Sequence, residues 1–417
     1  MNKKIVITII TCLAICFVCA FSACSNVNSL QSQETPGLGV VAPQQNKEEA
    51  VESETQTDIQ EETQKVESNT ESETSVESDP EIPADDIVFV EEETVAVGET
   101  QYVDYDGFTL LLENVGDGYS IIKVESDAKS IRIPSTGTNI VSIADRAFRG
   151  LTNLEELIIE CNTITSVGTY AFYNTPNLGK VTFPSSITNF GELSFYGSKY
   201  LNVARANDDN NLLVINDVIV DGRAAKGDLV IPSNIKSIAP KAFHNATELT
   251  SVSFEGSGVT RIPYQAFYGC KKLTSVNLSG IKNIADYAFT SCTSLESITG
   301  ISVSLSNIGA CAFKNDALLT KIDLSASNVS FIVGESAFEN CSGITEVVFP
   351  LAINVIEKNA FKNCTALATI EFNSATNTLT TIGEWAFYGD YKLVTIKNQS
   401  VMPTPALNAF EGTQIVL

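Results

Sequence analysis

Cysteine side chains carry the most reactive chemistry in this chain, and their spacing restricts what that chemistry can be. Four of the ten cysteines, Cys270, Cys292, Cys341 and Cys364, each follow a phenylalanine by three residues. Another copy of the same motif has Ala246 at this position, which favours a packing role for the slot. We expect free, packed thiols. Disulfides between Cys270 and Cys292, or between Cys341 and Cys364, stay open as an alternative outside the cell.

Motifs that mark catalytic or metal sites are missing from the body of the chain. Residues 101–417 contain no Cys-x-x-Cys pair, and His244 is the single histidine, so a zinc site is not expected. His244 directly follows a phenylalanine, and we expect it on the surface of a turn. No G-x-S-x-G elbow, Walker loop or His-Glu helix motif occurs, and the carboxylates are scattered. We therefore expect no enzyme activity, no cofactor and no metal.

A repeated motif organises residues 131–417. An Ala-Phe or Ser-Phe pair closes each of eleven copies at intervals of 22 to 26 residues, with one interval of 48 that equals two periods. The phenylalanines are Phe148, Phe172, Phe195, Phe243, Phe267, Phe289, Phe313, Phe338, Phe361, Phe387 and Phe410. In nearly every copy an apolar residue stands five positions before the phenylalanine, and leucine or isoleucine follows it by six. This period is the signature of a leucine-rich repeat solenoid.

Each copy predicts one strand and one returning turn. Residues 249–254 alternate at their end like a strand with one buried face. The phenylalanine ring fills the middle of the coil, and its small predecessor lies where backbones close up. One coil cannot bury this surface alone, so stability must come from stacking coil on coil. We expect a mainly β solenoid of about eleven coils, with short irregular or 3-10 turns.

The pattern Ile-x-x-x-Ala-Phe-x-x-Cys-x-x-Leu-x-x-Ile/Val-x-Phe/Leu resembles the BspA-type leucine-rich repeat of bacterial surface proteins. The resemblance runs from about residue 131 to the C-terminus. It implies a solenoid displayed outside the cell, with an extracellular-matrix protein or another cell as ligand.

Two segments depart from the regular repeat. Residues 87–130 alternate like strands around a hairpin turn at Gly116, and we expect a small β cap over the first coil. The insert 202–228 fills the double interval, and its residues 212–222 predict two short strands around Asn216 and Asp217. Such an insertion often binds a ligand. Alternatively, it is a degenerate coil that keeps the stack continuous.

Residues 1–24 have the features of an export signal. Lys3 and Lys4 precede an apolar run over 5–21, and small residues follow. The end of this segment resembles a bacterial lipobox, which implies that Cys24 becomes the first mature residue and carries lipid. An uncleaved membrane helix over residues 5–23 and plain secretion remain as alternatives. All three place the body outside the cytoplasm.

Charge is distributed unevenly along the chain. Residues 25–100 hold 20 acidic and 2 basic residues, a balance of −18 within the total of −24. The Ser/Thr/Glu composition of 25–86 predicts a disordered acidic tether, acting as a spacer or as a solubilising tail. Residues 101–417 carry a balance of −8. Nucleic acid is therefore not an expected partner, and the membrane is expected to meet the protein only through lipid.

Two surfaces are candidates for binding. The outward side chains of the strands are Thr250, Ser253, Asn277, Thr299, Asp323, Glu371 and Lys397. Aromatic residues at the turns are Tyr173, Tyr196, Tyr268, Tyr388 and Trp385, which we expect not to be contiguous in the stack. Solvent-facing Ser and Thr ladders alone would also explain the first set. We expect a monomeric, lipid-anchored surface protein that binds an extracellular protein or glycan. A structural envelope component that contacts the organism's own wall polymer is the alternative.

Overall fold

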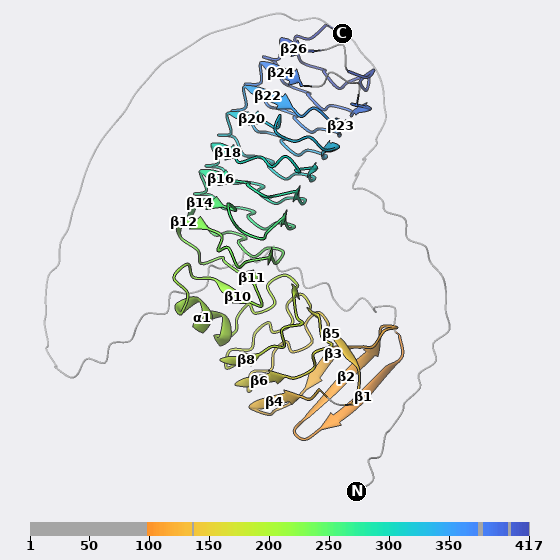
Figure 1. Ribbon diagram of the computed structural model, residues 1–417, viewed down its shortest axis with the longest axis vertical. Helices are drawn as coiled ribbons and strands as arrows, with labels where there is room; N and C mark the ends of the chain where they lie inside the picture. The colour runs from red at the N-terminus through yellow and green to blue at the C-terminus, as the bar shows by residue number, and fades with distance from the viewer. Residues whose placement is uncertain (1–97, 136, 374–377, 399–401, 417) are drawn as a thin grey trace, which may run out of the picture. The chain divides into compact units, whose positions relative to one another are not determined.

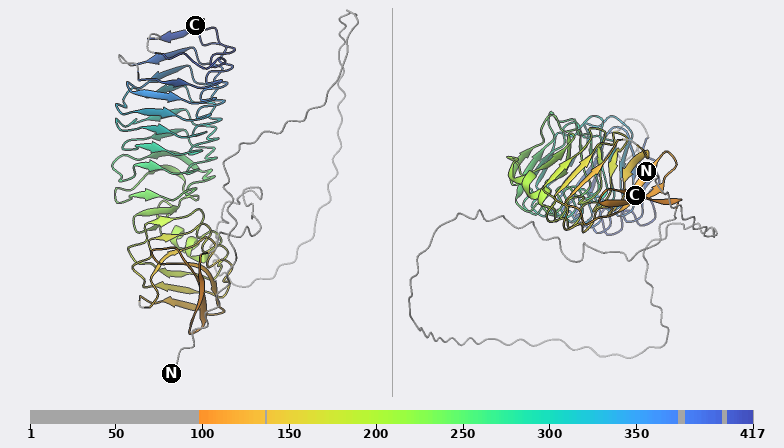
Figure 2. Two further views of the ribbon diagram at one scale, coloured as in Figure 1. Left: turned by 90° about the vertical axis from the view of Figure 1, so that its right-hand side faces the viewer. Right: turned by 90° about the horizontal axis from the view of Figure 1, so that it is seen from below.

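A computed structural model describes residues 98–417 except 136, 374–377, 399–401 and 417. Within them the chain winds into a β solenoid of about 11 turns, which confirms the predicted fold class (Figures 1 and 2). The expected export signal with Cys24, the acidic tether and the first residues of the cap lie outside the described residues. The predicted domain boundaries therefore stay predictions.

Each regular coil gives one strand to each of two faces, and neighbouring strands on a face pair in parallel. The first face carries β4 (Ser130–Ile133), β6 (Glu156–Ile159), β8 (Lys180–Thr182), β12 (Gly227–Val230), β14 (Leu249–Ser253), β16 (Ser275–Asn277), β18 (Ser297–Thr299), β20 (Lys321–Asp323), β22 (Glu346–Phe349), β24 (Thr369–Phe372) and β26 (Thr395–Lys397). They form the sheets β4-β6-β8, β12-β14-β16-β18 and β20-β22-β24-β26. Equivalent residues pair directly, as Val252 does with Val276, so side chains of one repeat position form rows along the stack.

The second face consists of shorter strands. They are β5 (Ile140–Ile143), β7 (Ser166–Val167), β9 (Asn189–Phe190), β11 (Val218–Asp221), β13 (Ser237–Ile238), β15 (Arg261–Ile262), β17 (Asn283–Ile284), β19 (Asn307–Ile308), β21 (Phe331–Val333), β23 (Ile353–Ile356) and β25 (Thr381–Ile382). The strands β15 to β25 form one continuous sheet. Their inward residues, such as Ile262 and Ile284, are buried.

The phenylalanines form the centre of the core, as predicted. All eleven are buried, and Phe410 in the last coil is the most exposed at 9 %. From Phe243 to Phe410 each ring stacks on the next with centroids 4.7–5.4 Å apart and planes within 12°. Stacked aromatic rings stabilise the fold by more than the area that they bury.

The turn around each phenylalanine is held by backbone hydrogen bonds to the next coil. Phe267 N–H donates to the carbonyl of Ala288, 2.8 Å away, and the same bond recurs along the stack. A second bond starts two residues after the ring, from Gly269 N–H to Thr290 O at 2.9 Å. Gly269 has φ +71°, and Gly or Asn fills this position in ten of the eleven copies because the left-handed region favours these two residues, while Ser291 fills it in the remaining copy. The residue type two positions after each phenylalanine could therefore have predicted the left-handed turn.

The N-terminal cap has three antiparallel strands. They are β1 (Thr100–Tyr105), β2 (Phe108–Asn114) and β3 (Tyr119–Glu125). The predicted hairpin at Gly116 is confirmed, whereas β1 was not predicted. β3 also pairs in parallel with β5, so the cap continues the second face and protects its first edge.

The insert replaces one regular coil with a different unit. Strands β10 (Leu213–Ile215) and β11 form the predicted hairpin, with Asn216 and Asp217 in the left-handed region that a two-residue turn requires. β11 also pairs in parallel with β13. Helix α1 (Lys199–Ala206), capped by Ser198, was not predicted.

Hydrogen-bonded sheets do not cross from β9 to β11, and the ring stack is broken there too. In the insert, Gly222 stands where the regular coils have the phenylalanine. No side chain fits at this position, because a Cβ would lie 2.2 Å from the Phe243 ring. Side chains bridge this junction. The Asn216 carboxamide donates to the carbonyls of Pro184 and Ile187 at 2.8 and 2.7 Å. Lys241 pairs with Glu192, 3.0 Å away, across the shortened turn of the insert.

A buried ion network fixes the insert. Asp221 accepts from Arg205 at 2.5 Å and from Arg223 at 2.7 Å, and all three side chains are less than a tenth exposed. Burial alone would raise the pKa of Asp221, but Arg223 and Arg205 outweigh it and the pKa is lowered. Arg223 also lies over the Tyr196 ring, 4.7 Å from its centroid. Asp221 thus supplies a buried anion that both guanidinium groups contact.

Candidate functional site

The predicted strand-face residues lie on β14 to β26 and point away from the core. Ser253, Asn277 and Thr299 are in direct register and form one row. In the next sheet Asp323, Glu371 and Lys397 follow the same position, and Val348 lies between Asp323 and Glu371. The structure therefore places the candidates in two short rows, one in each of two sheets.

Charged side chains on the second of these sheets pair with one another. Lys321 contacts Glu346 at 3.0 Å and Asp323 at 3.8 Å. Lys397 contacts Glu371 at 2.8 Å and Glu346 at 3.8 Å. The hydrogen bond to Glu371 raises the pKa of Lys397, and the hydrogen bond to Glu346 raises that of Lys321. Such exposed pairs contribute little stability, so this surface can exchange its internal pairs for those of a ligand at low cost.

Several of the predicted residues also have local structural roles. Asn277 Oδ1 accepts from Ser279, and Asp323 Oδ1 accepts from Ser325, in turns that end their strands. Thr250 donates to Asp228 at 2.8 Å. These bonds explain the choice of Asn, Asp and Thr without a ligand, and they restrict the side chains that remain available.

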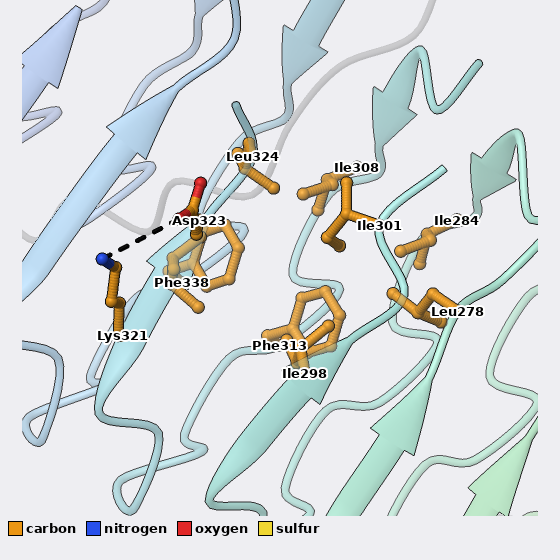
Figure 3. A pocket seen from close by; sticks show the side chains of 11 residues that line it. Leu278, Ile284, Ile298, Ile301, Ile308, Phe313, Lys321, Asp323, Leu324 and Phe338 are labelled. Carbon is orange, nitrogen blue, oxygen red and sulfur yellow. Dashed lines mark ion pairs between the residues drawn. The ribbon is translucent and has the colours of Figure 1, made fainter. Parts of the chain in front are cut away.

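The first face is interrupted between β18 and β20. The two strands belong to different sheets, and a small apolar cavity lies between them (Figure 3). Gly300 follows β18 where most other copies have Leu or Phe, such as Leu278 and Leu324, so side-chain volume is missing here. Ile298 and Ile301 line the cavity. Its volume is about 10 Å³, which is room for a single water molecule rather than for a ligand.

The four aromatic turn tyrosines occupy one repeat position, directly after a phenylalanine, whereas Trp385 stands two residues before Phe387. Part of the tyrosine set is contiguous. Tyr173 stacks on Tyr196 with centroids 5.8 Å apart, and Arg149 and Arg223 lie over these two rings. The expectation that these tyrosines would be separated in the stack is wrong. Coil-to-coil register aligns any two neighbouring copies, and the insert adds Arg223 to the row.

His244 is buried, with 5 % of its surface exposed, and its ring stacks on Tyr268 at 5.0 Å. The expectation of a surface histidine is therefore wrong. The row of residues after each phenylalanine packs side by side, and an aromatic neighbour covers the imidazole.

Trp385 and Tyr388 form a second aromatic group near the C-terminus. Lys358 lies 5.2 Å from the Trp385 centroid, and Lys362 lies 5.9 and 5.8 Å from the Trp385 and Tyr388 centroids. Both rings are half-buried. Cations over ring faces stabilise this group and leave ring edges and ammonium groups for contact with a partner.

The four repeat cysteines are free and fully buried. Asp316 and Asp390 occupy the same slot in two other coils and are also fully buried. Within the described part of the chain, no hydrogen bond reaches the side-chain oxygens of either carboxyl. Burial raises the pKa of Asp390 to about 9, and it raises the pKa of Asp316 well above its usual range.

Among the described residues, no group of three His, Cys, Asp or Glu side chains is arranged to hold a metal ion. In that same part of the chain, no helix has the length and apolar character needed to cross a bilayer.

A family model provides the decisive comparison. The BspA type leucine rich repeat region model matches residues 124–217, 225–332 and 331–416. The chain belongs to this family. Solenoids of leucine-rich repeats are typically non-enzymatic binding scaffolds, and proteins with this repeat are generally surface-associated. No curated protein matches the chain.

Solved structures of bacterial leucine-rich repeat proteins are similar to the chain. A leucine-rich repeat protein from Eubacterium ventriosum has 18 % identity, covers 76 % of this chain and 95 % of its own, and gives a TM-score of 0.37. One from Bacteroides ovatus has 19 % identity, with 76 % and 92 % covered and a TM-score of 0.35. A leucine rich cell surface protein from Faecalibacterium prausnitzii has 17 % identity, with 76 % and 99 % covered and a TM-score of 0.29.

Sequence reasoning missed one surface altogether. On the second face Arg261, Asn283 and Asn307 are in direct register, and a cleft opens beside them. The sequence could have indicated this row, because a polar residue stands six positions before the phenylalanine in three successive copies.

Proposed function

We propose that the protein is a lipid-anchored surface protein that binds extracellular protein or glycan ligands along its solenoid. The observation that supports this most directly is the register of the coils, which places equivalent side chains in rows on the outside. The interior is filled by the phenylalanine stack, so ligand contact is limited to these outer rows. Rows held by a rigid backbone are pre-organised, and pre-organisation reduces the entropy cost of binding.

Binding to isolated components tests this function. Purified full-length protein is exposed to immobilised extracellular-matrix proteins and, separately, to fractions of bacterial cell wall. Saturable binding to matrix proteins supports a role in adhesion. Binding to wall fractions alone would instead indicate a structural component of the envelope, and binding to neither contradicts the proposal.

The strand-face candidates are tested in the same assay. The double variant Lys321→Ala/Lys397→Ala removes both cations of the charged sheet, whereas Lys123→Ala removes a similarly exposed cation from the cap. We expect the first to weaken binding and the second to leave it unchanged. Equal affinities would remove this sheet from the binding surface. The variant Trp385→Ala tests the aromatic turns in the same way.

The anchor is tested separately by metabolic labelling with a fatty acid. Label is expected on the natural chain and not on Cys24→Ala, because the lipidated thiol is gone. Persistent label on the variant would show that the lipid, if any, is attached elsewhere.

A further inference from the structure

A polar cleft of about 360 Å³ lies on the second face of the solenoid. Its lining residues are Arg261, Tyr264, Asn283, Ala285, Asp286 and Asn307. They come from β15, β17, β19 and the turns that follow the first two of these strands. Ala285 is small, so the surface is low between the row of Arg261, Asn283 and Asn307 on one side and Tyr264 and Asp286 on the other.

Several polar groups in this cleft have no partner within the described part of the chain. Arg261 makes no ion pair, and the carboxamide of Asn283 makes no hydrogen bond. Asp286 Oδ1 accepts from Ala310 N–H at 2.8 Å, which orients the carboxylate. Asn307 Nδ2 donates to Ile284 O at 3.3 Å, which leaves the amide oxygen of Asn307 for a ligand. The sheet β20-β22-β24-β26 on the first face differs, because its lysines pair with carboxylates of the same sheet.

Tyr264 provides an aromatic surface beside these polar groups. It is 39 % exposed, and its ring meets Tyr287 edge to face with centroids 5.9 Å apart. That contact holds the ring while leaving part of it open to solvent. An amphipathic ring next to several amide and carboxylate groups suits a ligand that has one apolar face and many hydroxyl groups.

A sugar ring has this combination of properties. Its C–H face can pack on Tyr264, and its hydroxyls, which both donate and accept, match the carboxamides and Asp286. A peptide side chain would find little apolar surface, because Ala285 is the single aliphatic residue of the lining. Arg261 forms no ion pair among the described residues, so an anionic group on the ligand would gain a cationic partner.

We propose that this cleft binds a carboxylated sugar residue, a uronic acid unit of an extracellular polysaccharide, with its carboxylate on Arg261. The inference rests on the proposed binding function and specifies a ligand class for one surface. Because Arg261, Asn283 and Asn307 repeat at the spacing of paired strands, about 4.8 Å, a polysaccharide would extend across successive coils.

Calorimetric titration of the full-length protein tests the proposal. The probes are tetrasaccharides of galacturonate, of alginate and of hyaluronan, and galactotetraose serves as the uncharged comparison. We expect at least one acidic probe to bind more tightly than galactotetraose. Arg261→Gln should weaken that binding roughly tenfold to a hundredfold, the range for losing a hydrogen bond to a charged group. Its affinity for galactotetraose should change little.

Further variants separate the cleft from other causes. Tyr264→Ala should weaken acidic and neutral probes alike, whereas Lys123→Ala, in the N-terminal cap, should weaken neither. Unchanged unfolding temperatures show that each variant is folded. Failure of every acidic probe, or acidic binding that survives Arg261→Gln and Tyr264→Ala, overturns this inference. If matrix proteins or wall fractions still bind in that case, the proposed function stands without it.

Discussion

Cys364 Sγ donates a hydrogen bond to the carbonyl oxygen of Phe338, 3.2 Å away in the preceding coil. Cys270, Cys292 and Cys341 make the same bond to the phenylalanine of the coil before each of them. The slot three residues after the ring therefore favours a small donor, although Ala246 shows that a small apolar residue also fits. This preference is consistent with the recurrence of cysteine there, and it shows what is unusual about Asp316 and Asp390, whose carboxyls can donate only when protonated.

Stability should fall as the pH rises, because these two carboxyls keep their protons in the folded state. The folded pKa of Asp390 is about 9 and its ordinary value is 3.8. Below pH 3.8 both states are protonated, and the stabilisation is complete. Between the two values the unfolded chain releases a proton that the folded chain retains, so each such group lowers the free energy of unfolding by up to about 1.4 kcal/mol per pH unit. Denaturant titrations from pH 4 to pH 9 measure this slope.

Asp390→Cys should restore the regular slot and stabilise the protein at pH 7, by at most about 4 kcal/mol, since three pH units are involved. Its dependence on pH should also be flatter than that of the natural chain. Asp209→Asn, which changes an exposed carboxylate within the insert, serves as the control. A natural chain that is equally stable at pH 5 and pH 8, or an Asp390→Cys variant that is less stable at pH 7, would contradict this account.

The repeat cysteines should resist alkylation in the folded protein. Burial raises the pKa of Cys292, Cys341 and Cys364, so little thiolate forms at neutral pH. Cys311 is only half-buried and should react first. Mass spectrometry after iodoacetamide treatment, with and without denaturant, measures the order. Rapid labelling of Cys364 in the native state would show that the slot is open.

Removing one ring from the middle of the stack should destabilise the protein strongly. Phe313→Ala leaves a cavity between Phe289 and Phe338 and should cost about 3–5 kcal/mol. Tyr391→Ala, at a position that is 61 % exposed, should cost little. Chemical denaturation of the two variants compares them, and a similar loss for both would mean that the stack is not the main source of stability.

The buried ion network should be sensitive to the loss of its anion. Asp221→Asn removes the buried anion that Arg205 and Arg223 both contact and should cost about 3–5 kcal/mol. The matched control is Asp217→Asn in the same hairpin, where the ion pair with Lys236 is exposed and its loss should have little effect. Thermal unfolding of both variants tests the difference. Equal melting temperatures would exclude a structural role for the network.

Periodic features of the fold were predictable from sequence, because the same apolar positions recur in every coil. The ring stack, the first strand face and the hairpin at Asn216 followed from spacing and turn residues, whereas the strands of the second face lie where only a returning turn was predicted. Helix α1 was not predictable, since its eight residues interrupt the repeat and no other copy has an equivalent segment. Burial of His244 was also missed, because it depends on Tyr268 one coil away.

The binding surfaces were predictable only in part. Alternation identified the outward residues of the first face, but not that Lys321, Glu346 and Lys397 pair across coils. The cleft beside Arg261 was missed because the second strands are two or three residues long there and give little periodic signal. Its depth depends on the small Ala285 between larger neighbours.

The junction at the insert has a consequence for how the protein would respond to pulling. Side-chain contacts such as those of Asn216 with Pro184 and Ile187 connect β9 to β11. The second face is also interrupted between β13 and β15, but there backbone bonds such as Phe243 N–H to Ala266 O still join the two coils. Tension applied between a cell-bound N-terminus and a ligand near the C-terminus would load the connection between β9 and β11 along with every paired coil. It should therefore rupture first and lengthen the molecule in a discrete step before the ligand is released.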